Sequence, residues 1–154
     1  MSRARALQFL RKVKKFKTYL LQHKLLILKA FFVTGVMRIL LIVVPFKILK
    51  KYIGKYDEES SFNIDSINID IIEKISWAVT KLSIYTPWDS KCFVQALTAQ
   101  RLLYDKGLES TLYFGVSKSL DKGILEAHAW IRCGNIYVTG GNGEKFSIVA
   151  KFKK

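Results

Sequence analysis

The sequence has 154 residues, of which 50% are hydrophobic and 25% charged; this composition suits one domain with its own core and excludes a disordered chain or a small disulfide scaffold. Two cysteines and no recognisable secretory signal peptide favour free thiols in a reducing compartment, so a cytoplasmic protein is expected. The net charge of +14 is concentrated near the start, because residues 1–56 hold 14 Lys or Arg and no acidic residue, whereas residues 57–154 hold 12 of each sign. We therefore divide the chain into a basic helical N-terminal region (1–56) and an electrically balanced remainder (57–154).

Residues 4–52 have a helical pattern. Leu7, Leu10 and Val13 recur at three-residue steps, with basic residues between them. Such basic residues usually form a solvated face, and their stems cover apolar surface. A basic helix also attracts nucleic acid, but the sequence has no zinc-finger spacing, base-reading module or aromatic stacking platform, so nucleic acid is not an expected partner.

The segment 25–46 is apolar enough to raise the question of a transmembrane helix. Lys29 and Arg38 interrupt it, and Gly35 and Pro45 weaken a single long helix. A helix that crosses a bilayer needs about 20 largely uncharged residues, and a central Arg costs roughly 2.5 to 3.5 kcal/mol on insertion. We therefore expect a pair of helices that pack on the rest of the protein or lie on a membrane surface.

Two more helices are predicted downstream. Residues 61–86 carry apolar side chains at four-residue steps, namely Ile67, Ile71, Ile75 and Val79. A second helix begins near Cys92 and ends at Lys106-Gly107, a basic last turn followed by a glycine.

The hydrophobic period then changes to that of strands. Strands are predicted at 112–116, 124–132 and 136–139, with a polar loop at 117–123 and a turn at 133–135. A helix followed by three strands predicts an α+β fold whose sheet lies against the helix that begins near Cys92. Cys133, in the predicted turn, is assigned no role.

Cys92 is the first candidate for chemistry. If Ser90 or Asp89 caps the helix, Cys92 lies in its first turn, where the helix macrodipole favours a thiolate, the reactive form of cysteine. The free N–H groups of that turn can also donate to a developing oxyanion. The alternative interpretation is that Cys92 is a small buried hydrophobic residue.

His128 is the candidate general base. Strand alternation places it on one face with Glu126 and Trp130, and its two alanine neighbours leave room around the ring. A core histidine with a backbone partner is the alternative. No metal or cofactor is expected, because the four Cys and His residues lack the close spacings of metal ligands: His23, Cys92, His128 and Cys133.

Several short segments together resemble one known family: CFVQAL (92–97), Leu102-Leu103, Gly107, FGV (114–116), AHAW (127–130) and Gly134. They resemble the transglutaminase-like cysteine peptidases of lasso-peptide biosynthesis, which remove the leader of the precursor before the ring is closed. The resemblance covers residues 88–152 in motif detail, and the basic N-terminal region is also similar. It implies a papain-like core of helix and antiparallel sheet, with Cys92 as nucleophile and His128 as general base.

The third catalytic residue departs from the family pattern. The family usually has an Asp about a dozen residues after the histidine, whereas this chain has no carboxylate at 137–142. Asn142 is our prediction for the residue that orients the imidazole, as asparagine does in papain-like enzymes. Glu126, Glu144 and a main-chain carbonyl are the alternatives, and so is a chain that has lost activity.

The resemblance implies a thioester mechanism and a set of partners. The Cys92 thiolate attacks the carbonyl at the leader–core junction, His128 protonates the amine, and water resolves the thioester. The Cys92 N–H and the Trp88 indole are the expected oxyanion donors. The expected partners are the precursor peptide, a small leader-binding protein and an ATP-dependent cyclase, and the basic helices dock one of these or a membrane surface. An acyl transferase and a non-catalytic docking module are the rival functions.

Overall fold

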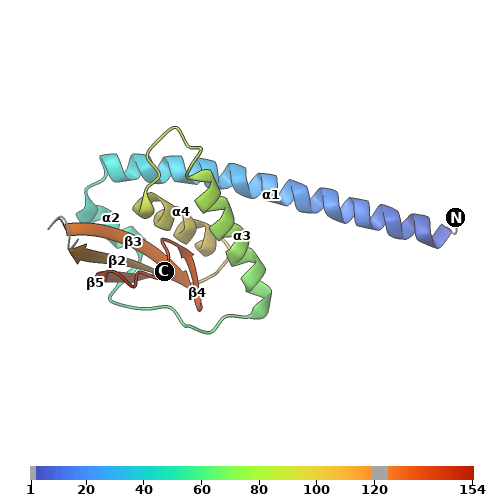
Figure 1. Cartoon of the computed structure of the whole chain (residues 1–154). Helices are drawn as coiled ribbons and strands as arrows, with labels where there is room; N and C mark the ends of the chain where they lie inside the picture. The colour runs from blue at the N-terminus through green and yellow to red at the C-terminus, as the bar shows by residue number, and fades with distance from the viewer. Residues whose placement is uncertain (1–2, 119–124) are drawn as a thin grey trace.

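The computed structural model describes residues 3–118 and 125–154, and for residues 3–22 and Ile67 it describes only the backbone. The elements are α1 (Arg3–Val43), α2 (Phe46–Ile53), β1 (Lys55–Tyr56), α3 (Ser66–Leu82), α4 (Cys92–Tyr104), β2 (Thr111–Lys118), β3 (Leu125–Cys133), β4 (Ile136–Thr139) and β5 (Ser147–Lys153). Helix α4 lies between the sheet and α1, and the first half of α1 projects beyond the rest of the protein (Figure 1). The predicted α+β fold with an N-terminal helical part is confirmed.

The sheet is antiparallel, with strand order β1-β5-β2-β3-β4. The three predicted strands are present as β2, β3 and β4, and β4 has the predicted limits. Residues 117–118 extend β2, and the rest of the predicted 117–123 loop lies outside the described residues. The prediction of only three strands was wrong, because β1 and β5 also join the sheet. Their pairing is long-range, Lys55 with Lys153 and Thr111 with Lys153, so no local sequence pattern specifies it.

The N-terminal region forms two helices, as predicted, but the break is at Pro45 alone. Proline has no N–H to donate and stands as the N-cap of α2. Gly35, which was expected to weaken the helix, lies within a continuous α1. A Cβ at this position would lie 3.1 Å from the Trp88 ring. The glycine therefore lets the indole pack directly against the helix.

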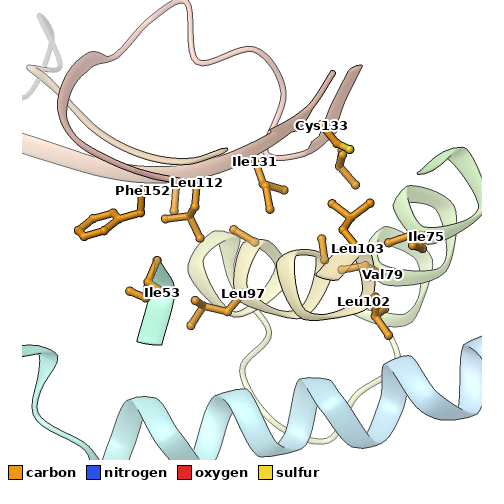
Figure 2. Packing of buried hydrophobic residues seen from close by; sticks show 14 of the residues in the cluster. Ile53, Ile75, Val79, Leu97, Leu102, Leu103, Leu112, Ile131, Cys133 and Phe152 are labelled. Carbon is orange, nitrogen blue, oxygen red and sulfur yellow. The ribbon is translucent and has the colours of Figure 1, made fainter. Parts of the chain in front are cut away.

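One hydrophobic core joins the helices to the sheet. Leu112, Ile131 and Phe152 point from the sheet toward α4, whose opposite side faces α1 (Figure 2). The buried face of α4 includes the predicted Ala96, Leu97, Leu102 and Leu103. The inner face of α1 completes the core through Leu26, Ala30, Val33, Met37 and Leu41. Each fully buried Leu or Ile contributes about 1.5–3 kcal/mol to folding.

Cys133 was predicted in a hairpin turn, and this was wrong. It is the last residue of β3, and its side chain is buried in the core with Ile131, two residues earlier on the same face. The turn itself begins at Gly134, whose φ of 58° suits glycine.

Candidate active site

Cys92 is the first residue of α4 and is half-buried. The predicted side-chain cap is not formed. Lys91 is the N-cap residue and makes no side-chain cap hydrogen bond. The Ser90 hydroxyl instead shares a hydrogen bond of 2.8 Å with the Thr86 hydroxyl, and the Asp89 carboxylate pairs with Lys91 at 3.3 Å. The prediction that Ser90 or Asp89 caps the helix was therefore wrong, because both side chains are held by neighbours in the preceding loop.

Cys92 lines a groove of about 480 Å³. The walls come from the end of α1, from α2 and from the start of α4, and they consist of Arg38, Leu41, Val44, Phe46, Leu49, Asp89, Lys91, Cys92, Phe93 and Val94. Most of these side chains are apolar, and the two basic ones, Arg38 and Lys91, both pair with Asp89. Such a groove can hold an apolar side chain of an extended peptide next to the thiol.

His128 lies on β3, opposite Gly115 of β2. Its Nε2 is 2.7 Å from the Gly140 carbonyl oxygen. A carbonyl only accepts hydrogen bonds, so this Nε2 carries a proton and donates it. In the neutral ring, Nδ1 is then the nitrogen with the free lone pair. The ring also stacks on Phe146, with 4.8 Å between centroids.

The segment 140–146, which follows β4, provides these contacts. Gly140 and Gly143 have φ of 80° and 68°. A Cβ on Gly140 would lie 2.5 Å from the Ala129 carbonyl oxygen, and one on Gly143 would lie 2.4 Å from the Trp130 ring. Only glycine allows the segment to lie this close to β3. This role was not predicted, although three glycines within four residues after a strand are a visible signal in the sequence.

Asn142 lies in the same segment but points elsewhere. It is exposed, and its amide donates to the Glu144 carboxylate. Glu126 is exposed on β3. Within the described residues, the hydrogen-bond partner of His128 is the Gly140 carbonyl, so of the alternatives for the third position the structure places only a main-chain carbonyl beside the ring.

Cys92 and His128 are not joined by a hydrogen bond in the described part of the chain. Ala129 and Ile131 pack in the core beneath α4. Because side chains alternate along a strand, His128 and Trp130 project from the other face of β3. That face also carries Phe146, against which His128 stacks. The backbones of the two residues belong to packed elements, α4 and β3, but the two side chains diverge.

Trp88, the other expected oxyanion donor, packs under α1. Its ring lies 4.8 Å from the Phe31 ring between centroids, and its Nε1 is buried without a hydrogen-bond partner among the described residues. Trp88 does not line the groove beside Cys92. In the described ranges, 3–118 and 125–154, no three His, Cys, Asp or Glu side chains gather closely enough to hold a metal ion.

The sequence profile of the transglutaminase-like superfamily matches residues 40–151, which is more than two thirds of the chain. The chain belongs to the transglutaminase-like superfamily. This superfamily includes cysteine peptidases and acyl transferases. The match contains Cys92, His128 and Asn142 and begins near the end of α1. No curated protein and no solved structure matches the chain significantly.

Membership of the transglutaminase-like superfamily points to cysteine chemistry at the α4–sheet unit. A cysteine at the start of a helix and a histidine on the packed sheet are the residue types that both peptidases and acyl transferases of this kind need. The superfamily does not by itself choose between water and an amine as the second reactant.

Proposed function

We propose that the protein is a cysteine peptidase that removes the leader from a lasso-peptide precursor, with Cys92 as nucleophile and His128 as general base. The observation that carries the proposal is the position of Cys92, a half-buried thiol at the first residue of α4 and at the wall of a peptide-sized groove. The free N–H groups of the first turn lie beside the sulfur, where an oxyanion would develop.

In the structure, the His128–Gly140 hydrogen bond holds the ring on the face of β3 away from Cys92. Once the ring has left this carbonyl and reached Cys92, its unprotonated nitrogen takes the thiol proton and later delivers it to the departing amine. The Cys92 sulfur then forms a thioester with the carbonyl carbon of the leader, and water, deprotonated by the same imidazole, releases the leader as a free acid.

The proposal requires a rearrangement, because the His128 side chain must reach the α4 side of β3. We propose that binding of the precursor, presented by a leader-binding protein, brings the two side chains together before the cyclase closes the ring. A His128→Cys variant in a Cys133→Ala background tests the approach directly. If the two positions meet, the thiol introduced at position 128 forms a disulfide with Cys92 under mild oxidation, seen by peptide mapping without reductant. Failure to form it with precursor present contradicts the proposal.

Activity is tested with the full chain, the precursor and its leader-binding protein, and mass spectrometry of the products. Cys92→Ala and His128→Ala are expected to abolish release of leader, whereas Cys133→Ala, which also removes a thiol, retains it. Cleavage by Cys92→Ala at the wild-type rate would overturn the assignment. A product in which the leader is joined to an amine, instead of a free acid, indicates an acyl transferase.

The third position is tested separately. Asn142→Ala is expected to leave kcat within about threefold of the wild type, because the Asn142 amide is exposed and donates to Glu144, not to His128. A loss of two or more orders of magnitude would return Asn142 to the role predicted from the sequence.

A second candidate is a non-catalytic docking module. The divergence of the Cys92 and His128 side chains favours it, since docking needs neither group. In that case both alanine variants support processing by the partner proteins as well as the wild type does.

A further inference from the structure

Helix α1 is apolar on two opposite sides. Its inner side is covered by α3, α4 and the core. Its outer side carries a second row of large apolar residues with the following exposed fractions: Leu25 57%, Leu28 53%, Phe32 62%, Val36 52%, Ile39 61% and Val43 70%. We call these six residues the outer stripe. Steps of three and four residues place them on one side of the helix, where a water-facing helix normally has polar residues.

The segment that contains the outer stripe is long enough to cross a bilayer. His23–Val43 has 21 residues and a mean hydropathy of 2.3, and only 11% of its apolar window is buried inside the protein. The core helix of a soluble protein can have the same length and composition, so these two properties do not by themselves identify a membrane helix. The packing of the segment decides how it can meet a membrane.

Crossing a bilayer would separate α1 from its own core. Ala30 is fully buried against the rest of the protein. Lys29 and Asp105 form an ion pair of 2.7 Å that ties the middle of α1 to the end of α4. Lipid on all sides of the segment would expose this inner face and the core beneath it. The fold is compatible with lipid on the outer side only, with α1 parallel to the membrane plane.

The charge of the N-terminal region identifies the kind of membrane. Residues 1–56 contain no acidic residue, and the projecting part of α1 carries seven basic residues: Arg3, Arg5, Arg11, Lys12, Lys14, Lys15 and Lys17. A basic segment that continues an apolar stripe is suited to anionic headgroups above an acyl layer. A second copy of the chain fits less well, because two such helices would bring ten basic residues from each copy together.

We propose that α1 is a surface anchor that lies on a bilayer containing anionic lipid. The outer stripe enters the boundary between headgroups and acyl chains, and the basic residues pair with lipid phosphates. The groove beside Cys92, which is lined by Arg38 and Leu41 of the same helix, is then held at the membrane surface. This anchor operates whether or not Cys92 is catalytic.

The test is cosedimentation of the full chain with vesicles of phosphatidylcholine, alone or with 30% phosphatidylglycerol, at low and high salt. We expect at least tenfold tighter binding to the anionic vesicles at low salt and a loss of most of this preference at high salt. Leu28→Ser/Ile39→Ser is expected to weaken binding at least tenfold. Its matched control is Leu125→Ser/Ile148→Ser on the sheet, where the same residue types are 71% and 54% exposed, and it binds like the wild type.

Three outcomes overturn the proposal. The first is equal binding by the outer-stripe variant and the wild type when both have native circular dichroism. The second is a protein that stays in the membrane fraction of cells after alkaline carbonate extraction, because a surface helix is released and a spanning helix is not. The third is a stable dimer of the wild type that does not bind vesicles and that does not form in the Leu28→Ser/Ile39→Ser variant.

Discussion

At the scale of single residues, the two thiols differ in surroundings and therefore in reactivity. Cys92 is half-buried at the wall of the groove, whereas only 2% of Cys133 is exposed. Burial raises the pKa of the Cys133 thiol to about 11, despite the opposing effect of the nearby Arg132 charge. A thiol with this pKa is almost entirely protonated near neutral pH, and the protonated form is a poor nucleophile.

Iodoacetamide is therefore expected to alkylate Cys92 at pH 8 while Cys133 remains unmodified. Peptide mass mapping over time measures both rates in one sample. In denaturant, both thiols are expected to react at similar rates, which serves as the control. Faster modification of Cys133 in the native protein would contradict the burial that the structure gives it.

Arg132 is buried at the centre of a hydrogen-bond network that was not predicted from the sequence. It is 1% exposed, and its guanidinium donates to the Tyr113 hydroxyl at 3.0 Å and to the Ser60 carbonyl at 3.0 Å. It also lies 3.7 Å from the centroid of the Phe62 ring. One side chain thus fastens the segment before α3 to the face of the sheet away from α4.

Replacing Arg132 with Met leaves these acceptors buried without a donor. We expect Arg132→Met to lower the free energy of unfolding by about 3 kcal/mol, the usual cost of removing one partner from a buried charged network. Urea denaturation followed by circular dichroism measures the change. Arg132→Lys keeps the charge but lacks the planar guanidinium. Its free energy of unfolding is expected to lie between those of the wild type and Arg132→Met. Wild-type stability in Arg132→Met would show that the network contributes little.

At the scale of elements, helix α4 begins without the side-chain cap that a serine, threonine, aspartate or asparagine at the N-cap position would provide. Lys91 occupies the N-cap position in the extended conformation that a capping serine adopts, but its side chain accepts no hydrogen bond. Lys91→Ser is expected to raise the free energy of unfolding by about 0.5–1 kcal/mol, since its hydroxyl can accept from a first-turn N–H. The ion pair that it removes, with Asp89, is largely exposed and contributes little.

Thermal or urea unfolding measures the Lys91→Ser change. Lys106→Ser, the same substitution just beyond the other end of α4, is the control and is expected to have no stabilising effect. A Lys91→Ser protein no more stable than the wild type would mean that the first turn of α4 is already satisfied by water at the groove.

At the scale of the whole molecule, α1 is joined to the α4–sheet unit by packing and by few ion pairs. The hydrogen bond from Lys29 is the largest of the effects that hold the pKa of the Asp105 carboxyl below its usual 3.8. Burial, the next largest, opposes it, and the charges of Lys29 and Arg101 lower the pKa further. Because the folded-state pKa is the lower one, the pair stabilises the folded protein above pH 3.8, and this stabilisation is lost as the pH falls through the folded value.

Asp105→Asn is therefore expected to be less stable than the wild type at pH 7 and equally stable well below pH 3.8. The difference at pH 7 is expected to be less than about 1 kcal/mol, because both groups are partly solvated. Urea titrations between pH 7 and pH 3 measure it. Lys29→Gln is expected to show a smaller loss, because Asp105 keeps its ion pair of 3.0 Å with Arg101. The double variant is expected to lose no more than Asp105→Asn does. If Asp105→Asn remains less stable than the wild type in acid, the difference is due to packing and not to charge.

How much could be predicted from the sequence depends on the range of the interactions. Helix α4 and strands β2 to β4 were predicted because the spacing of apolar residues along the chain is a local property. Gly107, predicted to follow the end of this helix, has the positive φ of 71° that suits glycine there. Strand β5 was missed, although Ile148, Ala150 and Phe152 alternate along it in the pattern of a strand. The side-chain cap at α4 was predicted wrongly, because the neighbours of Ser90 and Asp89 compete for their side chains.

The sequence by itself determined the α+β class, the basic character of the N-terminal helices and the residues that could carry chemistry, since periodicity, net charge and residue type are local properties. Tertiary structure alone decided which face of β3 His128 takes, that a carbonyl at Gly140 holds its ring, and that the outer side of α1 stays uncovered. Each of these depends on the packing of elements distant in the chain, and packing depends on shape and register that no short stretch of sequence contains.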